Sequence, residues 1–284
     1  MVNPPNTAGT RGEDSASARF AGAVRGRLVR LRRDGALTYV GLDRPEKMNA
    51  LDQALCDELT EVLLALRHEQ SIIVLHSTTP GVFVAGADIA ELLERDAEIG
   101  MRGVNATLFE LLESHRWPTV AVIDGPALGG GCELALACDL RVASARSVFG
   151  QPELGLGILA GAGGNWRLAQ AVGLTTARRM LYTGERLTAT QAHEAGLVDL
   201  VVDDEVEVLE RAGDYAERVA AQSWRALELT KVALRMHRPA TTLFDMTAQA
   251  LLFESDEKKA RMTAFLEERA RRRQARARTP KEES

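Results

Sequence analysis

The sequence predicts an α/β fold followed by a helical C-terminal region. Two short apolar runs without polar alternation, Ile72–Leu75 and Val120–Ile123, are typical of strands buried on both faces. Helix-like segments alternate with these strands, whereas only helical patterns follow Asp203. A chain of 284 residues, 45% of them hydrophobic, can bury a sizeable core without disulfide bonds.

The elements of the α/β part follow from local patterns. Leu28–Leu31 and Ala36–Leu42 predict a hairpin, because the Asp34-Gly35 pair between them favours a tight turn. Leucine and valine recur at intervals of three and four over Leu51–Leu66, which indicates one apolar face of a helix. Another helix-like stretch, Gly103–Glu113, precedes the second buried strand.

Three helices are expected in the C-terminal third, and a tail of different composition flanks each end of the chain. The helices span Glu205–Ala221, Ser223–Met236 and Leu243–Arg272. We therefore divide the chain into a disordered N-terminal extension (1–23), an α/β core (24–203), a helical region (204–270) and a flexible basic tail (271–284).

Composition argues against several function classes. With 35 basic and 40 acidic residues the net charge is −5, which disfavours general attraction to nucleic acid. The three cysteines and five histidines lack metal-ligand spacing, so we expect neither a metal site nor disulfides. Apolar stretches are too short to span a bilayer and no leader pattern opens the chain, so we expect a cytoplasmic protein with no membrane contact.

The first segment that could take part in binding or catalysis is Phe83–Ile89, which follows the first buried strand. Its small residues, Ala85, Gly86 and Ala87, would let a ligand approach the backbone. A helix begins near Asp88, and the first amides of a helix have no intrahelical partner and can stabilise a developing negative charge. The alternative is an ordinary helix start capped by Asp88.

A second strand-to-helix junction, Asp124–Leu134, contains three consecutive glycines. Such a run suggests that a thioester or phosphate approaches the main chain. Glu133 would lie in the first helical turn among apolar neighbours, where desolvation raises the pKa of a carboxyl group toward a value useful for acid–base catalysis. The alternative role of Glu133 is a favourable interaction with the helix dipole.

The third segment, Phe149–Gly157, places Glu153 on a loop after Pro152, from which it could project into a cleft. A second carboxylate near the first would form a pair able to handle protons and one water molecule. Spacing alone does not show that the two acids meet, and Glu153 could instead be an exposed loop residue.

Taken in order, these segments resemble the crotonase superfamily and, within it, enoyl-CoA hydratase. The resemblance extends from Leu28 to Arg269 and also includes an Asp43–Leu51 motif. It implies a spiral of ββα units with a helical C-terminal region that builds homotrimers or homohexamers. The implied substrate is an acyl-CoA thioester, and no cofactor beyond coenzyme A is implied.

The resemblance also assigns roles to individual residues. The thioester oxygen would lie between the backbone N–H groups of Ala87 and Gly130. Glu133 would act as the base for attack of water on C3, and Glu153 would deliver a proton to C2. Coenzyme A and the substrate would contact a further set of residues: Lys47, Met48, Ala50, Ala85, Gly86, Asp88 and Ile89.

Two other functions remain open at this stage. Double-bond isomerisation, or another acyl-CoA reaction on this scaffold, would use the same two amides, and isomerisation needs only one well-placed carboxylate. Alternatively, the arginine-rich run Arg269–Lys281 could bind RNA or an acidic partner through phosphate pairing.

Overall fold

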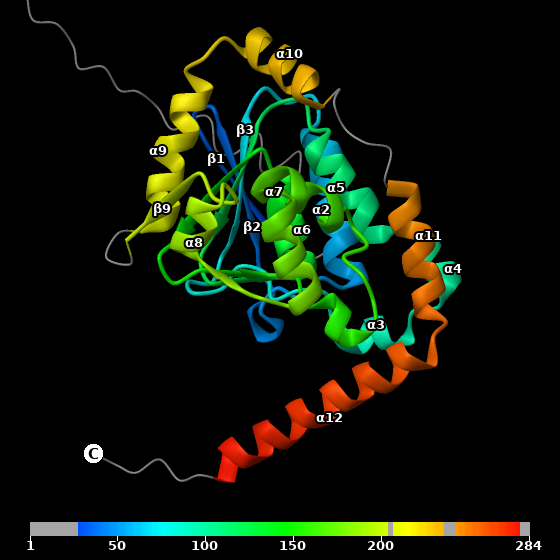
Figure 1. The fold of residues 1–284 in the computed structure, drawn as a ribbon. Helices are drawn as coiled ribbons and strands as arrows, with labels where there is room; N and C mark the ends of the chain where they lie inside the picture. The colour runs from blue at the N-terminus through cyan, green and yellow to red at the C-terminus, as the bar shows by residue number, and fades with distance from the viewer. Residues whose placement is uncertain (1–27, 204–206, 236–241, 279–284) are drawn as a thin grey trace, which may run out of the picture.

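The computed structural model describes residues 28–203, 207–235 and 242–278. Its main sheet has six strands in the order β1-β2-β3-β4-β6-β9 (Figure 1). The β1–β2 hairpin is antiparallel, as predicted, with Asp34 opposite Leu37, and every later neighbour pairs in parallel. These strands are β1 (Val29–Asp34), β2 (Leu37–Leu42), β3 (Ile72–Ser77), β4 (Thr119–Ile123), β6 (Leu140–Ser144) and β9 (Leu200–Val202).

A second, separate sheet has three short strands. Its strands are β5 (Pro126–Leu128), β7 (Val148–Gly150) and β8 (Leu187–Thr188). β5 and β7 are parallel, with Leu128 opposite Gly150, and β8 is antiparallel to β7. This register brings the chain that follows β7 beside the chain that follows β5.

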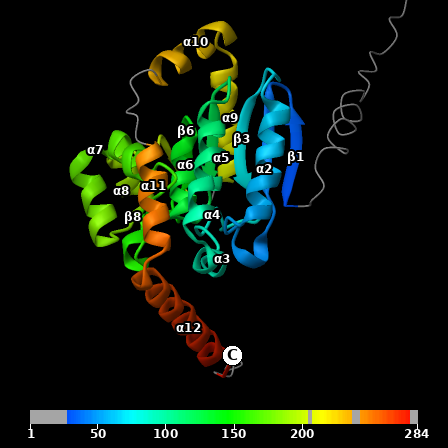
Figure 2. The ribbon, with the colours of Figure 1, turned by 90° about the vertical axis from the view of Figure 1, so that its right-hand side faces the viewer.

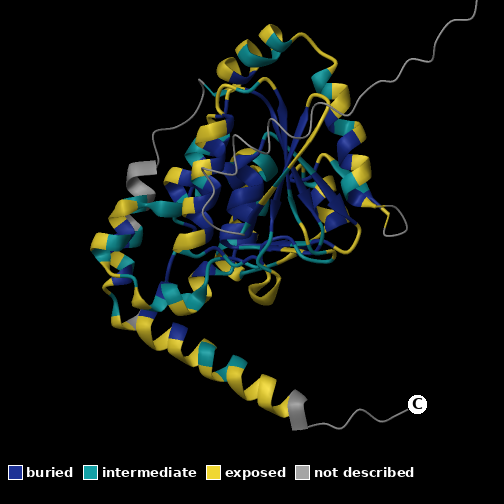
Figure 3. Cartoon of the chain, turned by 180° about the vertical axis from the view of Figure 1, so that it is seen from behind, coloured by how far each residue is buried: buried dark blue, intermediate teal, exposed yellow. Residues whose placement is uncertain are grey.

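Helices cover both faces of the main sheet, so the central strands are buried (Figures 1 and 3). On one face α2 (Gln53–Leu66), α5 (Val104–Glu113) and α6 (Gly130–Ala137) enclose the larger apolar core. α9 (Val208–Ala220) covers the opposite face with Val208, Ala212 and Ala216. Two further helices, α7 (Gly164–Thr183) and α8 (Ala189–Glu194), follow the site-forming loops. Among the described helices, none is long and apolar enough to cross a membrane.

The C-terminal region is helical, as predicted, but its last helix is not continuous. α10 (Trp224–Arg235) is followed by α11 (Thr242–Phe253) and α12 (Asp256–Arg278). The predicted single helix over Leu243–Arg272 breaks at Ser255, whose hydroxyl accepts a hydrogen bond from the Lys258 amide (3.1 Å) and so begins a new helix.

α12 leads away from the body of the molecule (Figures 1 and 2) and continues past the expected boundary at residue 270. The predicted N-terminal extension, 1–23, lies outside the described residues, as do residues 279–284 of the predicted tail.

The start of α6 packs backbone to backbone against the Phe83–Ile89 segment. A Cβ atom added to Gly131 would lie 2.1 Å from the carbonyl oxygen of Val84, far inside van der Waals contact. Isolated parallel bridges join Val84 to Ala127 and Leu51 to Ala87, which holds this segment in place. Only glycine at position 131 permits so close an approach.

We therefore expect Gly131→Ala to destabilise the fold by about 3 kcal/mol, because overpacking against a backbone atom cannot be relieved by a side-chain rotation. Chemical denaturation measures the loss. The matched control is Gly155→Ala, since a Cβ atom there would have no heavy atom within 4 Å. Equal stability of the two variants would contradict this account of the packing.

Candidate active site

One cavity collects residues from the three predicted segments. Its wall includes the start of α6, the 3-10 helix η2 (Glu153–Leu156), the short helices α3 (Ile89–Glu94) and α4 (Ala97–Arg102), and α11. Five of the predicted site residues line it: Ala87, Ile89, Gly130, Glu133 and Glu153. Glu133 and Glu153, which are 20 residues apart in the sequence, therefore lie in the wall of the same cavity.

The amides of Ala87 and Gly130 lie close together, one just before the N-terminus of α3 and the other at the N-terminus of α6. The bridge to Leu51 uses the carbonyl of Gly86 (2.8 Å) and the amide of Asp88 (3.0 Å), so the amide of Ala87 points away from that bridge. Gly130 is the first residue of α6, where an amide has no intrahelical partner. A Cβ atom on Gly130 would lie 3.6 Å from the Ala87 nitrogen.

Glu133 is buried and is oriented by backbone amides. Its Oε1 accepts hydrogen bonds from the amides of Ala162 and Gly164, each at 2.8 Å. Arg167, itself buried, donates to the carbonyl of Ala162 (2.7 Å) and pairs with Glu113 (2.7 Å), which fixes the loop that supplies those donors. Such hydrogen bonds favour the ionised form of a carboxyl group.

Glu153 is also buried and lies against the start of α6. A Cβ atom on Gly129, whose φ is +51°, would lie 2.8 Å from its Oε1. With its amide nitrogen turned toward the carboxylate, Gln151 donates to both oxygens at 3.0 and 3.1 Å. Burial, followed by repulsion from the charge of Glu133, raises the pKa of Glu153 well above its ordinary value. The two acids therefore differ in their environments, as an acid–base pair requires.

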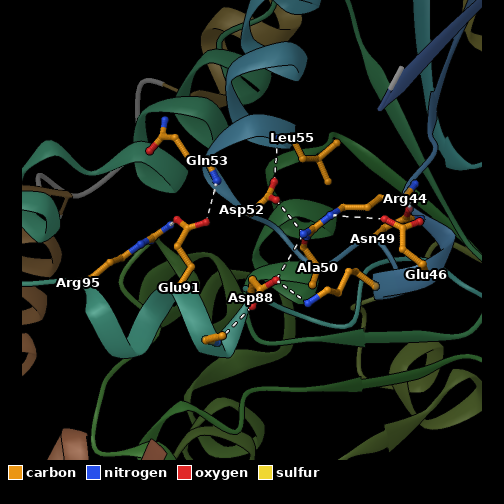
Figure 4. A network of polar contacts seen from close by, with 12 residues as sticks. Arg44, Glu46, Asn49, Ala50, Asp52, Gln53, Leu55, Asp88, Glu91 and Arg95 are labelled. Atoms are coloured by element: carbon orange, nitrogen blue, oxygen red, sulfur yellow. Dashed lines mark hydrogen bonds and ion pairs between the residues drawn. The ribbon is translucent and has the colours of Figure 1, made fainter. Parts of the chain in front are cut away.

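Two of the remaining predicted binding residues, Ala50 and Asp88, contact Arg44 in a network of ion pairs and hydrogen bonds (Figure 4). Asp88 caps α3 through the amide of Ala90 (3.1 Å), as the alternative interpretation predicts, and its carboxylate lies 3.4 Å from Arg44 and 3.6 Å from Lys47. Burial opposes ionisation of Asp88, but the charges of Lys47 and Arg44 outweigh it and hold its pKa below the ordinary value. Arg44 also donates to the carbonyl of Ala50 (2.6 Å).

Backbone contacts fix the other members of this set. The amide of Ala85 donates to the carbonyl of Met48 (3.1 Å), and Gly86 accepts from Leu51. The side chains of Lys47 and Met48 are about half exposed at this edge. None of Lys47, Met48, Ala50, Ala85, Gly86 and Asp88 is part of the cavity wall itself.

The three cysteines are buried as free thiols. Burial raises the pKa of Cys56 and of Cys138 to about 12, so neither thiol is a nucleophile at neutral pH. Within the described ranges, no group of three or more His, Cys, Asp or Glu residues is arranged to hold a metal ion.

Sequence reasoning missed the groups that orient the two acids. The glycine-rich run 161–164 could have indicated the amide donors of Ala162 and Gly164. The position of Gln151, two residues before Glu153, could have indicated its contact with that carboxylate. Asn105, which lines the cavity beside Gly130, had no signal beyond its position in a helix. Arg44 is part of the Asp43–Leu51 motif, but nothing in that motif marks it as the centre of an ion-pair network.

The family model described as enoyl-CoA hydratase/isomerase matches residues 32–274. A short-chain-enoyl-CoA hydratase of Clostridium acetobutylicum is 35% identical over 249 residues, covering 85% of this chain and 95% of that protein. A crotonyl-CoA hydratase of Syntrophomonas wolfei is 37% identical, covering 84% of this chain and 95% of that protein. The chain therefore belongs to the enoyl-CoA hydratase/isomerase family.

Solved structures agree with this assignment. An enoyl-CoA hydratase from Bacillus anthracis has a TM-score of 0.71 at 31% identity, covering 85% of this chain and 97% of that one. Another, from Bacillus halodurans, has a TM-score of 0.76 at 27% identity, covering 84% of this chain and all of that one (100%). The fold is the crotonase fold that the sequence resemblance implies.

The raised pKa of Glu153 leads to a prediction about stability. Since this pKa is higher in the folded protein than in the unfolded chain, the group favours folding at acid pH, and this contribution is lost as the pH rises through the folded-state pKa. We expect Glu153→Gln, which removes the buried charge, to melt at a higher temperature than wild type at pH 8. The gain should shrink as the pH approaches the ordinary pKa of glutamate.

Thermal melts at a series of pH values measure this effect. Glu61→Gln, at an exposed position of α2, is the matched control and should follow the wild-type pH dependence. A Glu153→Gln variant that melts at or below the wild-type temperature at pH 8 would contradict the prediction.

Proposed function

We propose that the protein is an enoyl-CoA hydratase, which adds water to a trans-2-enoyl-CoA and forms a 3-hydroxyacyl-CoA without a cofactor beyond the coenzyme A of its substrate. The observation that carries this proposal is the pair of buried acids, Glu133 and Glu153, in one cavity beside the amides of Ala87 and Gly130. Family membership and the hydratases among its relatives support it.

The two amides form the oxyanion hole of the proposed mechanism. The thioester carbonyl accepts from Ala87 and Gly130, and attack of water on C3 moves negative charge onto that oxygen. Preorganised donors stabilise the charge as it develops, and one such donor typically contributes about 3 kcal/mol. Both donors are backbone groups, so their positions depend on the chain path rather than on a side-chain rotamer.

The environments of the two acids assign their proton-transfer roles. Glu133, held in place by two amide donors, takes a proton from the attacking water. Glu153, whose pKa is raised by burial and by its neighbour, carries a proton and delivers it to C2. With both acids on one side of the substrate, addition is syn.

Coenzyme A binds, in this proposal, along the edge formed by the Asp43–Leu51 motif and the segment that ends at α3. The exposed ammonium of Lys47 would face the phosphates, while backbone groups contact the pantetheine. The proposed binding residues are those of the sequence resemblance: Lys47, Met48, Ala50, Ala85, Gly86, Asp88 and Ile89.

A homotrimer or homohexamer is the proposed assembly. Large apolar side chains on α10, namely Leu229, Val232 and Leu234, are exposed in the single chain, as is Leu251 on α11. Exposed apolar side chains of this kind commonly become buried between subunits.

Isomerisation is the nearest alternative reaction. The second acid argues against it, because moving a double bond requires one carboxylate and no attacking water.

The basic end of α12 has exposed arginines that could bind RNA. Arg271 and Arg272 are both paired with Glu268, however, which weakens the case for an RNA-binding surface.

We expect Glu133→Ala and Glu153→Ala each to lower kcat for crotonyl-CoA hydration about 10³-fold, with a small change in KM, because each removes one proton-transfer group. Loss of the conjugated-thioester absorbance measures the rate. Glu61→Gln should retain wild-type activity. Hydration that survives in either alanine variant, or a wild-type enzyme that only moves the double bond, would contradict the proposal.

A further inference from the structure

Three residues of α11, Met246, Gln249 and Phe253, form a part of the cavity wall that we call the end wall, and α12 begins three residues after Phe253. Phe253, at the end of α11, is 3% exposed and packs with Leu92 of α3, Ile158 and Met262 in a separate apolar cluster. A Cβ atom on Gly100 of α4 would lie 2.7 Å from the ring of Phe253, so α11 and α4 are in close contact at this end. Phe253 therefore lies between the cavity and the start of α12.

Lys258, in the first turn of α12, is fully buried and ties the wall to α3. Its ammonium donates to the carbonyl oxygens of Leu93 (3.1 Å) and Arg95 (2.8 Å), where the C-terminal end of α3 carries partial negative charge. The same ammonium lies 5.1 Å from the ring centre of Phe253, within range of a cation–π interaction.

The same turn of α12 also contacts η2. A Cβ atom on Gly157, which ends η2, would lie 3.2 Å from the Cα atom of Lys258. η2 begins with Glu153, whereas α3 begins just after Ala87 and Asp88. One lysine therefore connects the segment that follows the oxyanion amide to the segment that carries the second acid.

We propose that Lys258 is a positioning residue that holds Phe253 and the end wall closed, and that the closed wall restricts the substrate to short acyl chains. This inference rests on the proposed function for the identity of the ligand. Lys258 does not touch the reacting atoms, because its ammonium is occupied by the two carbonyls of α3. Without that contact α3 and α12 separate, and the wall opens to longer chains.

Binding of saturated thioesters, which cannot be hydrated, tests the wall separately from the chemistry. Calorimetry should give wild-type Kd values at least tenfold lower for butyryl-CoA than for octanoyl-CoA. We expect Lys258→Met, which keeps an unbranched side chain one atom shorter and removes the charge, to reduce this ratio to about threefold or less. Phe253→Ala, which opens the wall directly, should do the same and serves if Lys258→Met does not fold.

Lys259→Met is the matched control, since Lys259 is the next residue on α12 and is exposed. It should keep the wild-type ratio. Equal or tighter wild-type binding of octanoyl-CoA, or an unchanged ratio in a folded Lys258→Met, would overturn the inference. Crotonyl-CoA hydration is assayed in parallel: a wild-type protein that discriminates in binding but does not hydrate would refute the proposed reaction while the acyl-chain restriction stands.

Discussion

The site depends on a backbone contact between two distant parts of the chain. The segment from Val84 to Ala87 lies against the first turn of α6 so closely that position 131 has no room for a side chain. This contact places an amide from each segment at one point in the cavity. Because α6 is wholly buried and the neighbouring bridges fix the other segment, the distance between these amides cannot change without disturbing the core.

The two acids are buried together, which is costly unless each carboxyl group has its own partners. The donors to Glu133 come from the turn before α7, and that turn is held by Arg167 from within the helix. Glu153 accepts hydrogen bonds from the side-chain amide of Gln151 and is repelled by the charge of Glu133. The two carboxyl groups therefore have different environments, and burial together with the charge of Glu133 raises the pKa of Glu153.

Glu133 and Glu153 could each be predicted as site residues from the sequence. Glycines and Pro152 mark the loops and helix starts on which these two acids lie. That Glu133 and Glu153 meet could not be predicted, since it depends on the parallel register of Leu128 with Gly150 in the small sheet. The break of the last helix at Ser255 was missed because continuous polar and apolar periodicity conceals a capping serine. Arg167 was missed because an arginine is predicted to be exposed unless its buried partners, here a carboxylate and a carbonyl, are known.

The proposed oxyanion donors and the donors to Glu133 are all main-chain groups, and this has a consequence for how the protein can diversify. Apart from proline, no side-chain replacement removes a main-chain N–H, so these donors are insulated from most point substitutions. The wall formed by Phe253, Leu92 and Ile158 has no such insulation, since its shape is made of side chains. Under the proposed function, substitutions in the end wall change the range of acyl chains without removing the main-chain donors, which makes this wall the natural place to engineer the scaffold.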